Sequence, residues 1–363
     1  MSDEYIYISP YIKFRENKLE NVVTGNVFSG NRENMDLLKF IKENEPIELN
    51  ELHRNFLFSD ESVKYLLDNG IFVHDKNNPN AEITVENALV TEYDTFFNLK
   101  RGNLIDDLSK KKRIVGIIGI DAPTSSYIYN IDKKAYEVLR NKSKDIMDLS
   151  MCNFLAKDYG ILLNPLIQEL SFKWLADIGC LLLGSNIIPI FVGGDHGITY
   201  HLLQKFLKTS SNLSILQIDA HRDMGFRRSK YPEHGSFIKD LIAKSNNVKV
   251  YQYGIRDMDI GCYEDNIDKV DIIENISDVE GDDLYITIDV DAFSYADIPA
   301  VNYPLPNGLK IQDFLQDVQK ISCKRVIGCD IVEYNSQFDI GNNLGAVGVN
   351  YILLGLIKWL LNN

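Results

Sequence analysis

Largely apolar runs recur from residue 114 to the end of the chain, and acidic or imidazole side chains follow most of them directly. Runs of this length with few polar residues are typical of parallel strands buried on both faces. Segments with helical spacing separate them, and this alternation of strand and helix predicts a mainly parallel sheet between two layers of helices. The expected strands lie at 114–120, 187–192, 214–218, 284–288 and 325–329, and the expected helices at about 132–141, 164–184, 197–208, 236–245, 310–321 and 349–361.

The first hundred residues carry a different pattern, with short helices between short strand-like runs. Ser59 precedes one helical segment as a cap and Gly70 closes it, which are the residue types preferred at helix ends. We expect a small winged-helix-like α+β domain over residues 1–105 and a second domain over residues 106–363, with the basic run at 110–113 near the junction. The expected strands are 5–14, 71–73 and 82–85, and the expected helices are 34–43, 47–55 and 59–69.

This N-terminal pattern is similar to that of small peptide-recognition domains attached to enzymes that modify ribosomally made peptides. An extension used only for contacts between subunits is equally compatible with it. Binding to DNA is not favoured, because the third expected helix carries Asp60, Glu61 and Asp68 against Lys64.

Composition limits the classes of function. The formal net charge of −14 gives no dominant basic face and argues against nucleic acid as a partner. The N-terminus does not resemble a signal peptide, and no stretch approaches ~18 uninterrupted apolar residues, so neither a membrane span nor secretion is expected. The 5 cysteines are scattered without a CxxC pair, which fits small buried side chains in a reducing compartment. We expect a soluble, cytoplasmic protein.

The segment SILQIDAHRD (214–223) contains the most specific chemical signal. Its strand ends in Asp219, His221 and Asp223, and side chains two residues apart point to the same face of an extended chain. Two carboxylates and an imidazole at one point indicate a metal site. The imidazole favours Mn, Fe, Co, Ni or Zn over Mg or Ca.

Three other expected strands end in the same residue types. Asp195 and His196 follow a Gly pair, Asp289 and Asp291 stand two apart, and Asp330 and Glu333 end the last strand. Open α/β sheets bind ligands at the carboxyl ends of their strands, so these four ends can form one site.

The segments GGDHG, DAHRD, ITIDVD and GCDIVEYN, in this order, resemble the signature segments of the ureohydrolase family, the arginases and agmatinases. The resemblance extends over roughly residues 113–363, with further similarity in YGIRD (253–257). It implies a three-layer α/β/α arginase-like fold and a centre of two Mn²⁺ ions per chain. One ion would be held by His196, Asp219, Asp223 and Asp289, and the other by Asp219, His221, Asp289 and Asp291.

The same resemblance suggests residues beyond the metal ligands. His234, in EHGSF, is the candidate proton shuttle, although a histidine that only bonds backbone at a helix start remains an alternative. Glu333 matches the glutamate that pairs with a guanidinium, and Asp223 is expected to contact the substrate as well. Asp195 and Asp330 are expected to support the site rather than to bind metal.

Two departures from the family bear on the substrate. Gly225 and Pro232 occupy a stretch where arginases carry polar residues that hold an amino acid, so free L-arginine is not expected as the substrate. The segment 292–308 lacks the family's Gly-Thr-Gly-Thr run, which indicates a different or wider pocket. Basic side chains nearby would repel a small polycation or bind an acidic group, or else belong to a solvated loop: Arg222, Arg227, Arg228 and Lys230.

We therefore expect a manganese ureohydrolase that converts a guanidino compound to urea and an amine. Its substrate is either agmatine-like or an arginine within a peptide, which would become ornithine, and the chain is expected to form a homo-oligomer. The alternative is a metal-binding regulatory relative that has lost turnover. Retention of every charged ligand position favours the enzyme, because buried charges are costly to keep. His53, His74 and His201 are expected to have ordinary core or surface roles.

Overall fold

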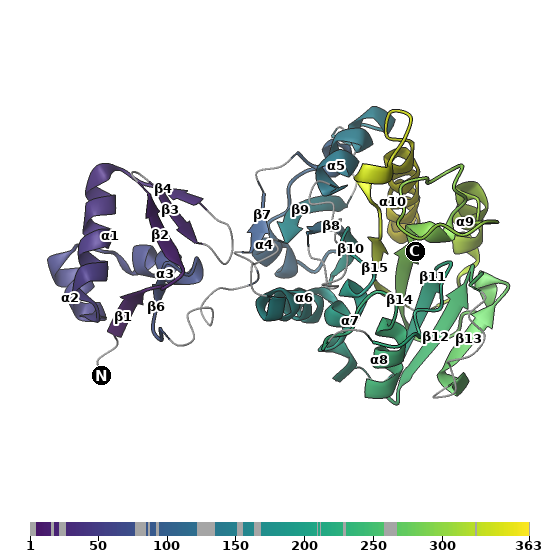
Figure 1. The fold of residues 1–363 in the computed structure, drawn as a ribbon, viewed down its shortest axis with the longest axis horizontal. Coiled ribbons are helices and arrows are strands. Elements are labelled where there is room, and N and C mark those ends of the chain that lie inside the picture. Colours follow the sequence, from purple (N-terminus) through teal and green to yellow (C-terminus); the bar gives the residue numbers. More distant parts are fainter. Residues whose placement is uncertain are drawn as a thin grey trace. The chain divides into compact units, whose positions relative to one another are not determined.

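The computed structural model describes residues 5–15, 18–21, 27–76, 85, 88–91, 94–121, 135–150, 155–162, 168–208, 210, 212–227, 230–257, 267–323 and 325–362. The chain divides into two compact units, shown in Figure 1: Met1–Leu89 with Leu163–Trp174, and Val90–Leu162 with Leu175–Asn363. The division after Leu89 lies before the boundary at residue 105 that we expected from the sequence.

In its described residues up to position 76, the N-terminal unit has two small antiparallel sheets and the three expected helices. One sheet has the order β5-β1-β6 and the other β2-β3-β4. Ser59 caps the third helix by accepting a 3.1 Å hydrogen bond from the N–H of Ser62. The winged-helix assignment stays a prediction, and residues 82–84 of the strand expected there lie outside the described residues. The elements are β1 (Tyr5–Ile8), β2 (Ile12–Arg15), β3 (Lys18–Asn21), β4 (Val27–Ser29), α1 (Arg32–Asn44), β5 (Ile47–Glu48), α2 (Leu49–Asn55), α3 (Asp60–Asp68) and β6 (Phe72–Val73).

The second unit is built on a sheet whose strand order, in the described part of the chain, is β13-β12-β11-β14-β15-β10-β8-β9-β7. The eight strands from β13 to β9 are mutually parallel. This arrangement confirms the mainly parallel α/β fold expected from the alternating pattern. The strands are β7 (Leu89–Val90), β8 (Ile114–Ile120), β9 (Ala156–Leu162), β10 (Ile187–Val192), β11 (Leu213–Ile218), β12 (Val248–Tyr253), β13 (Val270–Ile273), β14 (Asp283–Asp289) and β15 (Arg325–Val332).

Helices cover both faces of this sheet, which gives the three expected layers. On one face, α5, α9 and α10 contribute to the larger apolar cluster together with β10, β14 and β15. On the other face, α7 and α8 pack in a second cluster that includes Phe237 and Leu241. The helices are α4 (Leu104–Leu108), α5 (Ala135–Ile146), α6 (Gln168–Leu182), α7 (Ile198–Leu203), α8 (Phe237–Lys244), α9 (Ile311–Asp317) and α10 (Leu344–Asn362).

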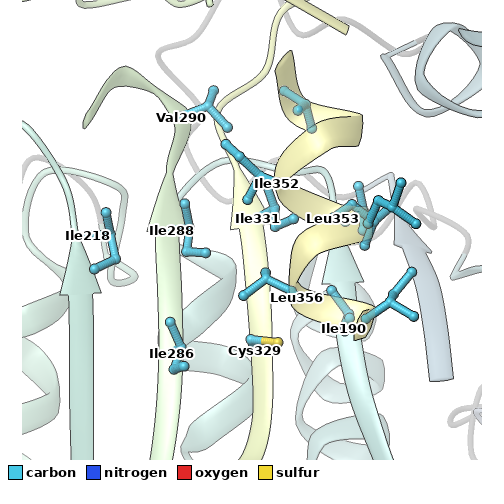
Figure 2. Packing of buried hydrophobic residues seen from close by; sticks show 14 of the residues in the cluster. Ile190, Ile218, Ile286, Ile288, Val290, Cys329, Ile331, Ile352, Leu353 and Leu356 are labelled. Atoms are coloured by element: carbon cyan, nitrogen blue, oxygen red, sulfur yellow. The ribbon is translucent and has the colours of Figure 1, made fainter. Parts of the chain in front are cut away.

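Helix α10 lies directly against the sheet. Figure 2 shows Ile352 and Leu356 of this helix beside Ile331 and Cys329 of β15. Its length and mean hydropathy of 1.7 would allow it to cross a membrane, but 67% of that stretch is buried within the protein. It therefore has the packing of a core helix.

The described cysteines are unpaired and differ in exposure. Cys329 is buried, Cys323 is half-buried and Cys180 is exposed. The expectation that the cysteines are buried is therefore wrong for Cys180, because it lies on the solvent side of α6. Cys152 and Cys262 lie outside the described residues.

Candidate metal centre

The predicted ligands lie where three parallel strands end. Register pairs Ile218 of β11 with Ile288 of β14, so Asp219 and Asp289 come next to each other at the carboxyl edge. Two strands away, β10 ends at Val192 and the chain turns through Gly193 and Gly194, which both have positive φ angles of 105° and 78°. That left-handed turn, which glycine adopts at little cost, brings His196 back over the ends of the other strands.

The first donor group forms around the ring of His196. Its Nδ1 lies 3.1 Å from Asp219 Oδ2, 3.0 Å from Asp223 Oδ2 and 3.5 Å from Asp289 Oδ2. The ring is fully buried and packs against Phe237, with 4.4 Å between ring centroids. Four of the predicted ligands thus converge on one point.

The second donor group shares Asp219 with the first. His221 Nδ1 lies 2.9 Å from Asp291 Oδ2 and 3.7 Å from Asp219 Oδ1. Ligand atoms of Asp219, His221 and Asp291 lie within 4.8 Å of one another, as do those of His196, Asp219 and Asp289. The structure therefore brings all six residues predicted as ligands into two overlapping groups.

Backbone hydrogen bonds fix the direction of these carboxylates. Asp219 Oδ1 accepts from the N–H of His221 at 2.7 Å, and Asp289 Oδ1 accepts from the N–H of Asp291 at 2.8 Å. Asp291 Oδ1 accepts from the N–H of Ala220 at 3.1 Å. In Asp289 and Asp291, the second oxygen is left to face the donor groups.

The cluster has more negative charge than its own histidines can balance. Burial, followed by the charge of neighbouring carboxylates, raises the pKa of Asp223 and of Asp289 well above the ordinary range. Burial also opposes a charged imidazole, yet the surrounding carboxylates raise the pKa of His196 well above its ordinary value and that of His221 to about 9. These directions follow from the burial of several carboxylates around two imidazole rings.

A divalent cation fits this site. Although His196 Nδ1 lies close to three carboxylates, it is a buried atom that makes no hydrogen bond of acceptable geometry. An unprotonated ring nitrogen with carboxylate oxygens around it is a donor set for Mn, Fe, Co, Ni or Zn. A bound divalent cation would therefore satisfy His196 Nδ1 and the carboxylates better than their contacts with one another do.

Glu333 lies beside the first donor group. Its Oε1 accepts a 2.9 Å hydrogen bond from the backbone N–H of His196, and Asn302 Nδ2 donates to its Oε2 at 3.4 Å. Asn335 in turn donates to Asn302 Oδ1 at 3.0 Å. Burial, and next the charge of Asp195, raises the pKa of Glu333, so a cationic partner would stabilise its ionised form.

His234 lies near enough to Glu333 for its charge to lower the carboxyl pKa. Its ring stacks on Tyr303, with centroids 5.9 Å apart and planes inclined by 13°. Its Nδ1 is buried without a hydrogen-bond partner. The structure thus places the predicted shuttle residue at the site, beside a tyrosine that is 55% exposed.

Neither Asp195 nor Asp330 belongs to the two donor groups found among the described residues. Asp195 Oδ1 accepts from the N–H of Gly197 at 3.1 Å, which is the turn-forming role expected for it. Asp330 lies fully buried in β15 and accepts hydrogen bonds from three hydroxyl groups: Thr199 at 2.9 Å, Tyr285 at 2.7 Å and Thr287 at 2.5 Å.

Sequence reasoning missed a polar row beneath the ligands. Register aligns Gln252, Gln217, Thr287 and Asp330 across β12, β11, β14 and β15. Gln217 and Thr287 each stand two residues before a predicted ligand, on the same strand face. A polar residue at this position in an otherwise apolar strand was the signal that could have identified them. Gln217 Nε2 donates to Asp219 Oδ2 at 2.7 Å, and Gln252 Nε2 donates to Gln217 Oε1 at 2.8 Å.

The basic side chains expected beside the site are largely engaged. Arg227 pairs with Asp240 at 3.1 Å, and Arg222 Nε donates to Gln252 Oε1 at 3.4 Å. Lys230 Nζ lies 5.0 Å from the ring centroid of Tyr231. Arg228 lies outside the described residues.

Arg256, in the YGIRD segment, holds the loop after β14. Its guanidinium donates to the carbonyl oxygens of Asp291 at 3.0 Å, Ala292 at 3.0 Å and Pro306 at 2.9 Å. This side chain therefore positions the loop that carries Asn302 and Tyr303.

Comparison with known proteins agrees with this geometry. The model of the Arginase family matches residues 127–355, more than half of the chain. Among curated relatives, an agmatinase of Bacillus anthracis is 26% identical over 197 residues, which cover 49% of this chain and 66% of the relative. The mitochondrial arginase 1 of Arabidopsis thaliana is 30% identical over 176 residues, covering 44% of this chain and 51% of the relative. These alignments span between half and two thirds of the relatives' length.

A solved structure shares the fold. Proclavaminate amidino hydrolase from Streptomyces clavuligerus superimposes with a TM-score of 0.61 over 75% of this chain and 98% of that chain. The sequence identity is 19%, so this similarity concerns the fold alone.

Proposed function

Because this chain belongs to the arginase family, we propose that it is a metal-dependent ureohydrolase, which cleaves a guanidino C–N bond and releases urea and an amine. One observation carries the proposal. Two groups of metal-ligand atoms share Asp219, and Glu333 lies beside them on the backbone N–H of His196. The site thus combines cation donors with a carboxylate suited to a guanidinium.

We propose that each chain holds two Mn²⁺ ions. His196, Asp219, Asp223 and Asp289 would hold one ion, and Asp219, His221, Asp289 and Asp291 the other. When bound, the ions would supply Lewis-acid activation of water near neutral pH. The donor set also suits Fe, Co, Ni or Zn.

Glu333 would orient the substrate. Its carboxylate is fixed on both oxygens, by the N–H of His196 and by Asn302, so it can form a directed pair with a planar guanidinium. Burial and the charge of Asp195 raise the pKa of this carboxyl group. The positive charge of the substrate would offset both effects and stabilise the ionised carboxylate. The pairing therefore favours substrates that keep their guanidino charge.

His234 would move the proton that the reaction requires. Hydrolysis forms a C–O bond at the guanidino carbon and breaks a C–N bond, and the departing nitrogen must receive a proton to leave as an amine. A histidine beside Glu333 and stacked on an exposed tyrosine can donate it.

The surroundings of the site do not favour free arginine. A free amino acid carries an α-carboxylate, which needs a cationic or polar partner. Among the described cations near the site, Arg227 pairs with Asp240 and Arg256 donates to backbone carbonyls. Arg222 donates to Gln252. This supports a substrate without that carboxylate, either an agmatine-like amine or an arginine within a peptide.

The N-terminal unit would serve recognition or oligomerisation. It has a groove of about 510 Å³ lined mainly by apolar side chains of α1, α3 and the segment between α2 and α3, including Leu37, Phe56, Phe58 and Tyr65. Leu57 also lines the groove and is 86% exposed. An apolar groove of this kind fits a peptide segment better than a small guanidine. We further propose that the chain works in the cytoplasm as a homo-oligomer.

A urea-release assay tests the function. The purified chain, loaded with Mn²⁺, is incubated with agmatine, with an N-acetylated arginine peptide amide and with free L-arginine. We expect urea from agmatine or from the peptide and at least tenfold less from free arginine. Urea from none of them would support the regulatory relative instead, and free arginine as the best substrate would contradict the argument from the engaged cations.

A further inference from the structure

The ring of His196 is held from behind by a buried hydroxyl. Its Nε2 lies 2.8 Å from Thr287 Oγ1, while its Nδ1 faces the carboxylates of the donor group. Thr287 is fully buried on strand β14, two residues before Asp289 and opposite Asp330 of β15. The two ring nitrogens therefore meet different environments.

The direction of the hydrogen bonds can be deduced from the hydroxyl chemistry. A threonine hydroxyl has one hydrogen, and Thr287 donates it to Asp330 Oδ1 at 2.5 Å. Only lone pairs of Oγ1 then remain for His196, so Nε2 must carry a hydrogen and donate it. Nδ1 is left without a hydrogen whenever the ring is neutral.

The surroundings of Asp330 favour its role as the acceptor of the hydrogen bond from Thr287. As a carboxylate it can only accept, and Tyr285 and Thr199 donate to its other oxygen at 2.7 and 2.9 Å. All of these side chains are fully buried, or nearly so, so water does not compete for the bonds.

We propose that Thr287 and Asp330 are positioning residues that fix the tautomer and orientation of His196, so that its Nδ1 is ready to bind the divalent cation of the first donor group. This inference rests on the metal site of the proposed function but not on hydrolysis. It implies that the hydroxyl of Thr287 contributes to metal affinity although it is not a ligand.

The test is calorimetric titration of the metal-free full-length chain with Mn²⁺. Thr287→Val keeps the shape and removes the hydroxyl, and it should weaken the ion held by His196 by about 10- to 100-fold. The ion held by His221 and Asp291 should change by less than about threefold, because its donors do not contact Thr287. Thr287→Ser restores the hydroxyl and should restore the affinity.

Tyr285→Phe is the matched control. It removes the hydroxyl that donates to Asp330 Oδ2, and this hydroxyl makes no hydrogen bond to His196. The variant should therefore destabilise the network but leave metal affinity within about threefold of the wild type. Equal affinity in wild type and Thr287→Val would overturn the proposal. So would an equally large loss in Tyr285→Phe, or a wild-type chain that does not bind Mn²⁺.

A second measurement observes the unaltered network and uses a variant only to assign the resonances. In the Zn²⁺-loaded wild-type chain with ¹⁵N-labelled histidine, NMR should show a hydrogen on Nε2 of His196 and none on Nδ1. His196→Asn assigns the resonances by their loss. A hydrogen on Nδ1 in the loaded chain would overturn the proposal independently of how the variants fold.

Discussion

The backbone N–H of His196 donates a 2.9 Å hydrogen bond to Oε1 of Glu333, so one residue links the carboxylate cluster to the carboxylate expected to face the substrate. The two residues are 137 positions apart in the chain and follow strands β10 and β15, which are neighbours in the sheet. Glu333 has a positive φ of 67°, which is uncommon for a residue with a side chain. Strained backbone of this kind occurs at functional sites, where the surrounding structure fixes the direction of a side chain.

Replacing Glu333 with glutamine should show whether the negative charge of this side chain is needed as well as its hydrogen bond to His196. The amide oxygen can still accept from His196, but the negative charge that pairs with a guanidinium is lost. We expect kcat/KM for the preferred substrate to fall by about 100-fold or more, with Mn²⁺ content unchanged. Kinetics together with metal analysis measure this, and unchanged kcat/KM would show that other groups orient the substrate.

His234→Ala should affect turnover more than metal binding. Loss of a general acid typically lowers the rate by about 10²- to 10⁴-fold, whereas His234 belongs to neither donor group. The measurement is kcat at saturating substrate alongside bound Mn²⁺. His201→Gln serves as a control because His201 is a buried histidine on α7. If both variants lose activity to the same extent, His234 has no special part in the chemistry.

His201 should make the protein less stable in mild acid. Burial, and next the charge of Lys244, lowers the pKa of His201 to about 3, whereas the unfolded chain binds the proton near its ordinary value of 6.5. Between these values the unfolded state holds more protons, so stability falls as the pH decreases below about 6.5. From pH 7 to pH 5.5 the wild type should lose about 1 kcal/mol more than His201→Gln.

Denaturant unfolding of the two proteins at each pH gives this difference in the free energy of unfolding. Groups that titrate in both proteins, such as the carboxylate cluster, contribute equally to both and so do not affect the difference. Parallel stability curves for wild type and His201→Gln would mean that folding does not lower the pKa of His201.

The groove of the N-terminal unit should matter for peptides only. Leu57 is 86% exposed and has a positive φ of 56°, a conformation that asparagine tolerates well. Leu57→Asn should therefore keep the fold while removing apolar contact, and raise KM for an arginine peptide by about tenfold with agmatine unaffected. Val27→Thr, at another exposed apolar side chain of the same unit, is the control. Equal kinetics for peptide and agmatine in all three proteins would exclude the groove from substrate recognition.

The residues that could be predicted from the sequence are those marked by strong local patterns. Strand 114–120 agrees with β8, because seven buried apolar residues in succession leave little choice of structure. The ligand residues came together because same-face spacing and parallel strand ends are geometric consequences of the sheet. Thr287 and Gln217 were missed, because a single polar residue in a strand has no partner visible in the sequence. Their partners, Asp330 and Gln252, lie on adjacent strands that are distant in the chain, and only the strand order reveals them.

The central claim is that two ions sharing Asp219 support hydrolysis of a guanidino group. The most direct measurement is stepwise addition of Mn²⁺ to the metal-free chain, with bound metal and urea production from agmatine and from the arginine peptide recorded at each step. We expect two Mn²⁺ per chain at saturation, with urea production rising as the second ion binds. Asp219→Asn should lose both ions together, whereas Asp291→Asn should mainly lose one. Full urea production by the metal-free chain, or two tightly bound Mn²⁺ in Asp219→Asn, would contradict the account.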